Sequence, residues 1–290
     1  MSSTSGPVLY DVAGPEEKAR GRRISIVLSV VLLALAAGVI ALFARNGVFD
    51  DRWRVLVDVP RNFAGFETRH VWQAIFRGLG NTLLAAVIAL PLAALLAVVL
   101  VSLRSSPVAP LRWLVIALTE VFRGLPVVLM MFFGILVLPG ATPLIAVVFG
   151  LVMYNAAVLA EILRAGIAAL PKGQTEAAQS VGMGPFLIYR DIQLPQAVRM
   201  MLPSLIAQGV VLVKDSSLGY IVGYAELLRS VSRVADALTD ASYLLPLLAV
   251  GAAVYIALNI ALSRLAVWVQ RHSSFARKAP ARITGAPPLP

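Results

Sequence analysis

Residues 171–195 read PKGQTEAAQSVGMGPFLIYRDIQLP and separate two long apolar blocks of the chain. Their pattern predicts two short helices. Gly182 is expected to end the first, because glycine tolerates the left-handed backbone that follows many helices. Pro185 suits the first turn of the second, and Leu194-Pro195 is expected to break the chain before the next apolar block. Such a helix pair either docks into a partner's groove or lies on the membrane surface.

The composition of the chain indicates a polytopic membrane protein. Of its 290 residues, 59% are hydrophobic and only 14% are charged, which is more apolar side chain than a soluble domain can cover. The chain has no cysteine, so disulfides and thiolate metal sites are excluded. The net charge of +10 fits loops that face anionic lipid. Nucleic-acid binding is not expected, since no basic run is interleaved with aromatic residues.

Six apolar segments are long enough to cross a bilayer, which needs about 20 helical residues. The predicted spans are 24–44, 78–103, 113–138, 142–167, 197–221 and 243–269. The first is too long for a typical signal peptide, so an uncleaved extra N-terminal helix is expected there. The fold class is therefore all-α and polytopic. The predicted domains are cytoplasmic disordered tails (1–23 and 271–290), an extracytoplasmic loop with an interfacial helix (45–77) and the main transmembrane domain (78–270).

The charge distribution favours six spans with both chain ends in the cytoplasm. This topology also places residues 171–195 on the cytoplasmic side. A group of arginines then falls outside, against the positive-inside tendency: Arg45, Arg52, Arg54, Arg61, Arg69 and Arg77.

No catalytic machinery is evident in the sequence. The motif G-x-x-x-x-G-K-[ST] is missing, so the chain is not expected to hold ATP in the P-loop manner. The two histidines, His70 and His272, are far apart, and no Ser/His/Asp grouping suggests a nucleophile. We expect no metal and no cofactor on this chain. Any ATP-driven work must come from another subunit.

Charged residues inside the predicted spans are informative, because an ionisable group in lipid is costly unless it is paired or hydrated. Glu120 with Arg123, and Glu161 with Arg164, are spaced i,i+3 and can pair on one helix face. Residues 214–215 are adjacent, point apart and need separate partners. Two interpretations stay open: helix-packing pairs, or a water-filled pathway for a zwitterionic amino acid. The candidates for the pathway are Arg123, Glu161, Arg164, Lys214, Asp215, Ser216 and Ser217.

The polar segment also carries a specific pattern. Glu176-Ala177-Ala178, three residues, Gly182, nine residues, Ile192, one residue and Leu194-Pro195 follow in order. This resembles the EAA loop of the membrane subunits of binding-protein-dependent ABC importers. Glu176 is expected in the first turn of its helix, where an acid is favourable.

Further blocks resemble the polar amino acid branch of that family. They are FRGLP at 122–126, EILRAGI at 161–167, PKGQ at 171–174 and KDSSL at 214–218. The family usually has threonine where Leu125 stands. The opening VLYD at 8–11 and GRR at 21–23 resemble membrane subunits of actinobacterial glutamate importers.

The resemblance implies a five-helix type I importer core, with the extra N-terminal helix, in a bacterial cell membrane. It also implies that residues 171–195 form a cytoplasmic coupling helix that docks in a cleft of an ATPase subunit. The contact residues would be Gly173, Gln174, Glu176, Ala177, Ala178, Gly182, Leu194 and Pro195. The implied partners are a cytoplasmic ATPase dimer that holds ATP-Mg, a second permease subunit (itself or a paralogue), an extracytoplasmic solute-binding protein, membrane lipid and an amino acid substrate.

The implied function is that of a non-catalytic permease subunit that imports glutamate or a related polar amino acid. Two other classes are kept as alternatives. A secondary transporter driven by ions often shows inverted repeats with interrupted helices, and no pairing of halves is visible in this sequence. A membrane scaffold would transport nothing.

Overall fold

The computed structural model describes residues 15–45, 47, 51–59, 67–238 and 241–272. These residues are largely helical and include no β-strand. The ends of both predicted tails, 1–14 and 273–290, lie outside the described residues. The chain divides into two compact units, Met1–Arg54 and Val55–Pro290, and each is described by itself.

The first unit contains one long helix, α1 (Pro15–Arg45). It includes the predicted span 24–44 but begins earlier, so residues 15–23 are helical and not part of a disordered tail. From residue 19 onward its side chains are exposed, and they are mostly aliphatic. A helix that is apolar on every side suits a lipid environment. A 3₁₀ helix, η1 (Asp51–Leu56), follows.

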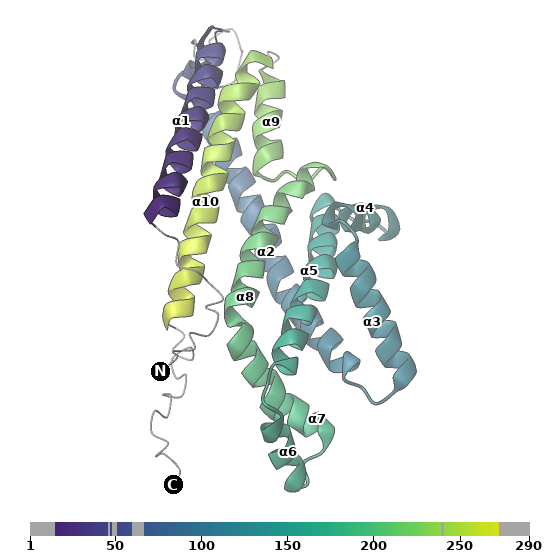
Figure 1. Ribbon diagram of the computed structural model, residues 1–290. Helices are drawn as coiled ribbons and strands as arrows, with labels where there is room; N and C mark the ends of the chain where they lie inside the picture. Colours follow the sequence, from purple (N-terminus) through teal and green to yellow (C-terminus); the bar gives the residue numbers. More distant parts are fainter. Residues whose placement is uncertain (1–14, 46, 48–50, 60–66, 239–240, 273–290) are drawn as a thin grey trace, which may run out of the picture. The chain divides into compact units, whose positions relative to one another are not determined.

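The second unit is an antiparallel arrangement of long helices with short ones at either end (Figure 1). The helices that form it are α2 (Thr68–Arg104), α3 (Ala109–Gly124), α4 (Val127–Val137), α5 (Pro143–Ala168), α6 (Lys172–Ser180), α7 (Pro185–Leu187), α8 (Leu194–Asp215), α9 (Leu227–Ala237) and α10 (Leu244–His272). Three short segments join them: the π-helix η2 (Ile188–Gln193) and the 3₁₀ helices η3 (Ser216–Tyr220) and η4 (Ala241–Tyr243).

Among the described residues, five helices are long and apolar enough to cross a membrane. The predicted third span, 113–138, is instead a broken one, because α3 and α4 meet at an angle of 108°. Leu125 is extended, and Pro126 stands as the N-cap of α4. Proline disfavours a helical conformation in the residue before it, so the FRGLP block is a corner and not the middle of a straight helix.

Helix α2 is longer than its predicted span. It begins at Thr68 and not at Gly78, and its 37 residues extend about 55 Å, well beyond a hydrocarbon core of about 30 Å. Its start is capped reciprocally, since the backbone N–H of Glu67 donates to His70 Nδ1 at 3.0 Å and the Glu67 side chain accepts from the first turn. Part of the predicted loop 45–77 is therefore the first part of this helix.

The main core lies where α2 packs against α5. The buried face of α2 is built from small residues, namely Ala85, Ala86, Ala89, Ala93 and Ala97. Small side chains allow helix backbones to approach closely in membranes. The same principle brings α4 onto α5, since a Cβ at Gly150 would lie 2.7 Å from the backbone nitrogen of Met131.

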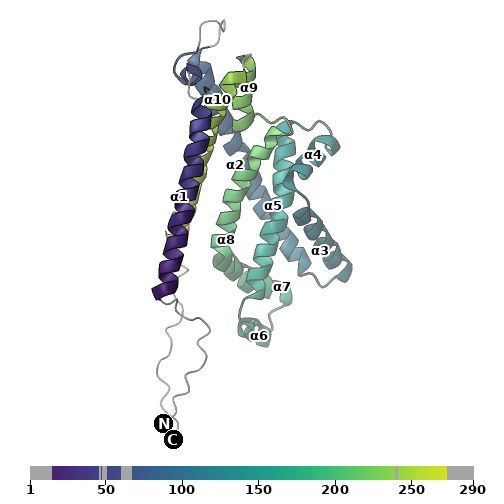
Figure 2. The same ribbon diagram turned by 45° about the horizontal axis from the view of Figure 1, so that its top comes forward.

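A second core joins α9 to α2 and α10, at the end of this unit opposite to α6 and α7 (Figures 1 and 2). Helix α9 buries Leu227, Val231 and Val234 on one face. A Cβ at Gly78 would lie 2.8 Å from the Cα of Leu227. The glycine therefore permits a close crossing of α2 and α9 that any larger residue would obstruct.

Candidate functional site

Residues 171–195 form the expected helix pair, α6 followed by α7. Gly182 between them has a positive φ of 78°, and Pro185 occupies the first turn of α7, which confirms both predictions. The prediction for Glu176 was wrong, since α6 already begins at Lys172 and no acid lies in its first turn. Pro171 is the N-cap of α6, so the helix begins earlier in the chain than predicted.

The helix pair projects from one end of its unit (Figure 2) and exposes most of the predicted coupling residues. Gly173, Gln174, Glu176, Ala177 and Gly182 are exposed, whereas Ala178 is buried against the rest of the unit and Leu194 and Pro195 are half-buried. Apolar side chains are exposed at the tip as well: Val181 to 76%, Phe186 to 65% and Leu187 to 42%. An exposed apolar patch rimmed by polar residues is typical of a surface that binds a partner.

This segment is firmly attached to the spans. Tyr189 Oη lies 3.1 Å from Ser102 Oγ of α2. Within the segment, Gln193 Nε2 of η2 donates to Thr175 Oγ1 of α6 at 3.1 Å. The prediction of a break at Leu194-Pro195 was wrong, because η2 continues directly into α8. The N–H of Leu194 reaches back to the carbonyl of Tyr189, and Pro195, which has no N–H, lies in the first turn of α8.

The intramembrane charges of α3 and α5 pair as predicted. Arg164 Nε donates to Glu161 Oε1 at 2.9 Å, and Arg123 pairs with Glu120 on α3. The structure adds Arg104 at the end of α2, whose Nη1 donates to Glu161 Oε2 at 3.2 Å. No signal in the sequence predicts this contact of Arg104, because no spacing rule connects positions so far apart in the chain.

The two pairs also act on each other electrostatically. Arg123 acts on the carboxylate of Glu161, and Glu120 acts on the guanidinium of Arg164. Three cations and two acids from α2, α3 and α5 thus form one group, which we call the α3–α5 charge cluster (Arg104, Glu120, Arg123, Glu161 and Arg164).

The other predicted pathway residues lie at the end of α8 and are not hydrogen-bonded or ion-paired to this cluster in the described part of the chain. Lys214 is exposed and borders an open groove of about 870 Å³ between α8 and α10, with Asn259 and Arg264. Asp215 is half-buried. Within the described residues, neither Lys214 nor Asp215 forms an ion pair, so the separate partners predicted for them are not found there.

The two serines serve the helix end. Ser216 is fully buried and its hydroxyl donates to the carbonyl of Val213 at 2.7 Å. Ser217 Oγ donates to the carbonyl of Lys214 at 2.8 Å, which also accepts from Tyr255 Oη at 2.8 Å. These bonds satisfy carbonyls that the end of α8 leaves without a helical partner.

Glu226 caps α9 from a fully buried position. Its two carboxylate oxygens accept from the backbone N–H groups of Arg229, at 2.7 Å, and Leu228, at 2.8 Å. Burial raises the pKa of Glu226 above its usual value, although these hydrogen bonds and the charge of Arg229 act in the other direction.

Comparison with known proteins identifies the family of this chain. Residues 89–274 match the family described as "Binding-protein-dependent transport system inner membrane component". The chain belongs to this family. It is a multi-pass protein of the bacterial cell membrane, as the long apolar helices indicate independently.

Relatives of this membrane component include amino acid permeases. The chain is 42% identical over 214 residues to the glutamate transport system permease protein GluD of Corynebacterium glutamicum, with 71% of this chain and 77% of the relative covered. It is 32% identical over 209 residues to the glutamate/aspartate import permease protein GltK of Escherichia coli O6:H1, with 68% and 92% covered.

Solved structures agree with the fold. A crystal structure of an amino acid ABC transporter with histidines superimposes with a TM-score of 0.62 at 26% identity and covers 69% of this chain and 94% of its own. An inward-facing MetNI methionine ABC transporter has a TM-score of 0.57 at 19% identity, with 70% and 97% covered, and supports the fold alone.

Proposed function

We propose that the chain is the permease subunit of an ATP-driven importer of glutamate or a related polar amino acid. Family membership supports the transport role, and relatives named for glutamate and for glutamate/aspartate support the substrate class. The single observation that carries the mechanism is the helix pair of 171–195, which exposes the apolar side chains of Val181, Phe186 and Leu187.

In this proposal the helix pair docks into a groove of a cytoplasmic ATPase. The surface offered would comprise Gly173, Gln174, Glu176, Ala177 and Gly182, all exposed. Ala178, Leu194 and Pro195 would act from the base of the segment. Because η2 continues into α8, a displacement of the docked segment would tilt α8 as a rigid element and alternate the access of the pathway.

Partners follow from the same proposal. Two ATPase subunits would bind ATP-Mg, a second permease subunit (a copy of this chain or a related one) would complete the pathway, and a solute-binding protein would deliver the amino acid from outside. The family description names a binding-protein-dependent system, which supports the last of these. This chain would hydrolyse no ATP itself.

The substrate pathway is proposed to use the intramembrane charges. Arg123, Glu161 and Arg164 would present both signs of charge to a zwitterion, and Lys214 and Asp215 would do the same at the end of α8. Ser216 and Ser217 would hold the turn that follows α8, since their hydroxyls are bonded to its last carbonyls.

Docking is tested by placing a charge at Phe186, one of the exposed apolar residues of the helix pair. In membranes that contain all subunits, Phe186→Glu should reduce ATPase co-purification and ATP-driven glutamate uptake at least about tenfold, because it puts a charge into an interface whose core should be apolar. Val108→Asp is the matched control, since Val108 is also exposed but lies outside the segment, at the N-cap of α3 where aspartate is favourable.

Normal assembly and uptake in Phe186→Glu, or equal losses in both variants, would refute the docking role. A second experiment addresses the secondary transporter. Uptake that persists in vesicles without the ATPase and follows an ion gradient would overturn the importer proposal. Full assembly without any amino acid uptake would instead favour a membrane scaffold.

A further inference from the structure

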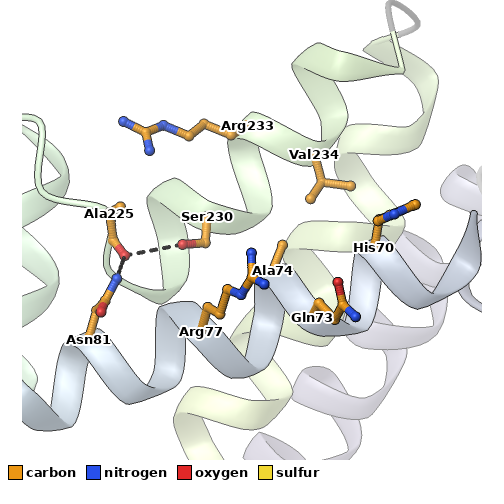
Figure 3. A pocket seen from close by; sticks show the side chains of 9 residues that line it. All are labelled: His70, Gln73, Ala74, Arg77, Asn81, Ala225, Ser230, Arg233 and Val234. Atoms are coloured by element: carbon orange, nitrogen blue, oxygen red, sulfur yellow. Dashed lines mark hydrogen bonds between the residues drawn. The ribbon is translucent and has the colours of Figure 1, made fainter. Parts of the chain in front are cut away.

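An open pocket of about 530 Å³ lies between the first part of α2 and helix α9 (Figure 3). We call it the α2–α9 pocket. Its polar lining residues are His70, Gln73, Arg77, Asn81, Ser230 and Arg233. It lies at the end of the unit opposite to α6 and α7 (Figure 1), which is the outer end if the helix pair meets a cytoplasmic ATPase.

The walls of the α2–α9 pocket are fixed by packing and hydrogen bonds. Gly78 brings α9 so close that a Cβ there would be 2.8 Å from Ser230 Cβ. Asn81 Nδ2 donates to the carbonyl of Ala225 at 2.7 Å, and Ser230 Oγ donates to the same carbonyl at 3.2 Å (Figure 3). Tyr224 Oη donates back to the carbonyl of Asn81 at 2.8 Å. The pocket is thus preformed.

Its charge is one-sided. Arg77 and Arg233 are both exposed. In the described part of the chain neither forms an ion pair, unlike Arg69, which pairs with the nearby Glu67 at 2.9 Å. Among the described residues that line the pocket, none is an acid. Two acids are near in sequence: Glu226, whose carboxylate accepts from the backbone of α9, and Asp236, three positions after Arg233 on α9.

We propose that the α2–α9 pocket binds the carboxylates of an acidic amino acid before it enters the spans. The inference rests on the proposed function and narrows its substrate to an anionic amino acid. A guanidinium binds carboxylate through two parallel hydrogen bonds, and Arg77 and Arg233 contribute two guanidinium groups to the lining. A basic, partly enclosed pocket also concentrates anions, which gives outward-facing arginines a role despite the positive-inside tendency.

The test uses the lack of native cysteine. Gln73→Cys introduces a single thiol into the pocket of the full-length chain, expressed with its partner subunits. Intact cells are treated with an anionic or a cationic methanethiosulfonate reagent, and the labelling rate of this chain is measured. The anionic reagent should react faster, and Arg77→Gln with Arg233→Gln should lower the anionic-to-cationic rate ratio about tenfold or more at low salt.

Two controls accompany this measurement. Arg69→Gln, on the same helix but outside the lining, should leave the ratio within about twofold, because its charge is already paired with Glu67. Arg77→Lys with Arg233→Lys should keep most of the ratio, which separates loss of charge from loss of structure. Saturating L-glutamate should slow labelling several-fold in the Gln73→Cys chain, whereas L-glutamine, its neutral isostere, should not.

Several outcomes would overturn the inference. Equal protection by glutamate and glutamine, or none by either, would mean that the pocket does not bind the anionic amino acid. Protection by the solute-binding protein alone would make it a protein contact. Labelling only from the cytoplasmic face would refute the topology of the proposed function itself. If L-glutamate fails to protect the thiol while ATP-driven uptake still depends on Phe186, this inference is refuted and the proposed function stands.

Discussion

Replacing Glu161 and Glu120 with glutamine tests the α3–α5 charge cluster. Both acids pair with an arginine three positions on, but their surroundings differ. The Glu161 side chain is 24% exposed and has a second partner, Arg104, whereas Glu120 is 48% exposed. Glu161→Gln removes the carboxylate shared by two guanidinium groups, Arg164 and the less exposed Arg104 at 23%. Glu120→Gln removes the partner of Arg123 alone, which is 41% exposed.

The magnitudes follow from burial. Breaking a buried ion pair on one side costs about 3 to 5 kcal/mol, and the partial exposure of Glu161 brings our expectation to about 2 to 3 kcal/mol. An exposed pair contributes about 0 to 1 kcal/mol, which is the expectation for Glu120. For a chain of this length, about 2 kcal/mol corresponds to a fall in Tm of about 3 °C.

The assay is thermal unfolding of the full-length protein in detergent, followed by tryptophan fluorescence, with ATP-driven uptake measured on the same variants. Glu161→Gln should lower the Tm clearly and Glu120→Gln by about 2 °C at most. Equal shifts for the two variants, or a larger shift for Glu120→Gln, would contradict the assignment of Arg104 and Arg164 to a shared carboxylate.

The remaining predictions concern Gly78, Glu226 and Lys214. Gly78→Val should abolish stable folding or lower the Tm strongly in the same assay, because its side chain would overlap the backbone of Leu227, whereas Gly80→Val, with open space around it, should have a much smaller effect. Glu226 has a raised pKa, so its stability contribution is present below the usual carboxyl range and is lost as the pH rises through the raised value. Tm should therefore fall as the pH rises above the usual carboxyl range, and Glu226→Gln should flatten this slope. Lys214→Ala should raise the half-saturation for uptake if Lys214 lines the pathway, and unchanged kinetics would assign it to packing.

The sequence by itself determined the class of the protein and its local geometry. Apolar segments of bilayer length can only be helices, because lipid offers no partner to an unpaired backbone group. The pairs of Glu120 with Arg123 and Glu161 with Arg164 follow from helical periodicity. Likewise Gly182 and Pro185 impose their turn through their own backbone preferences. Each of these statements depends on residues within a few positions of one another.

Only the tertiary structure decided which distant segments meet. Arg104 joins Glu161 because α2 and α5 pack along their alanine-rich faces, and the α2–α9 pocket exists because Gly78 lets α9 cross α2 closely. The corner at Leu125 and the passage of η2 into α8 were likewise unforeseen. Local rules show that proline disturbs a helix, but the packing of neighbouring helices determines whether the chain bends sharply or absorbs the disturbance in a wider turn.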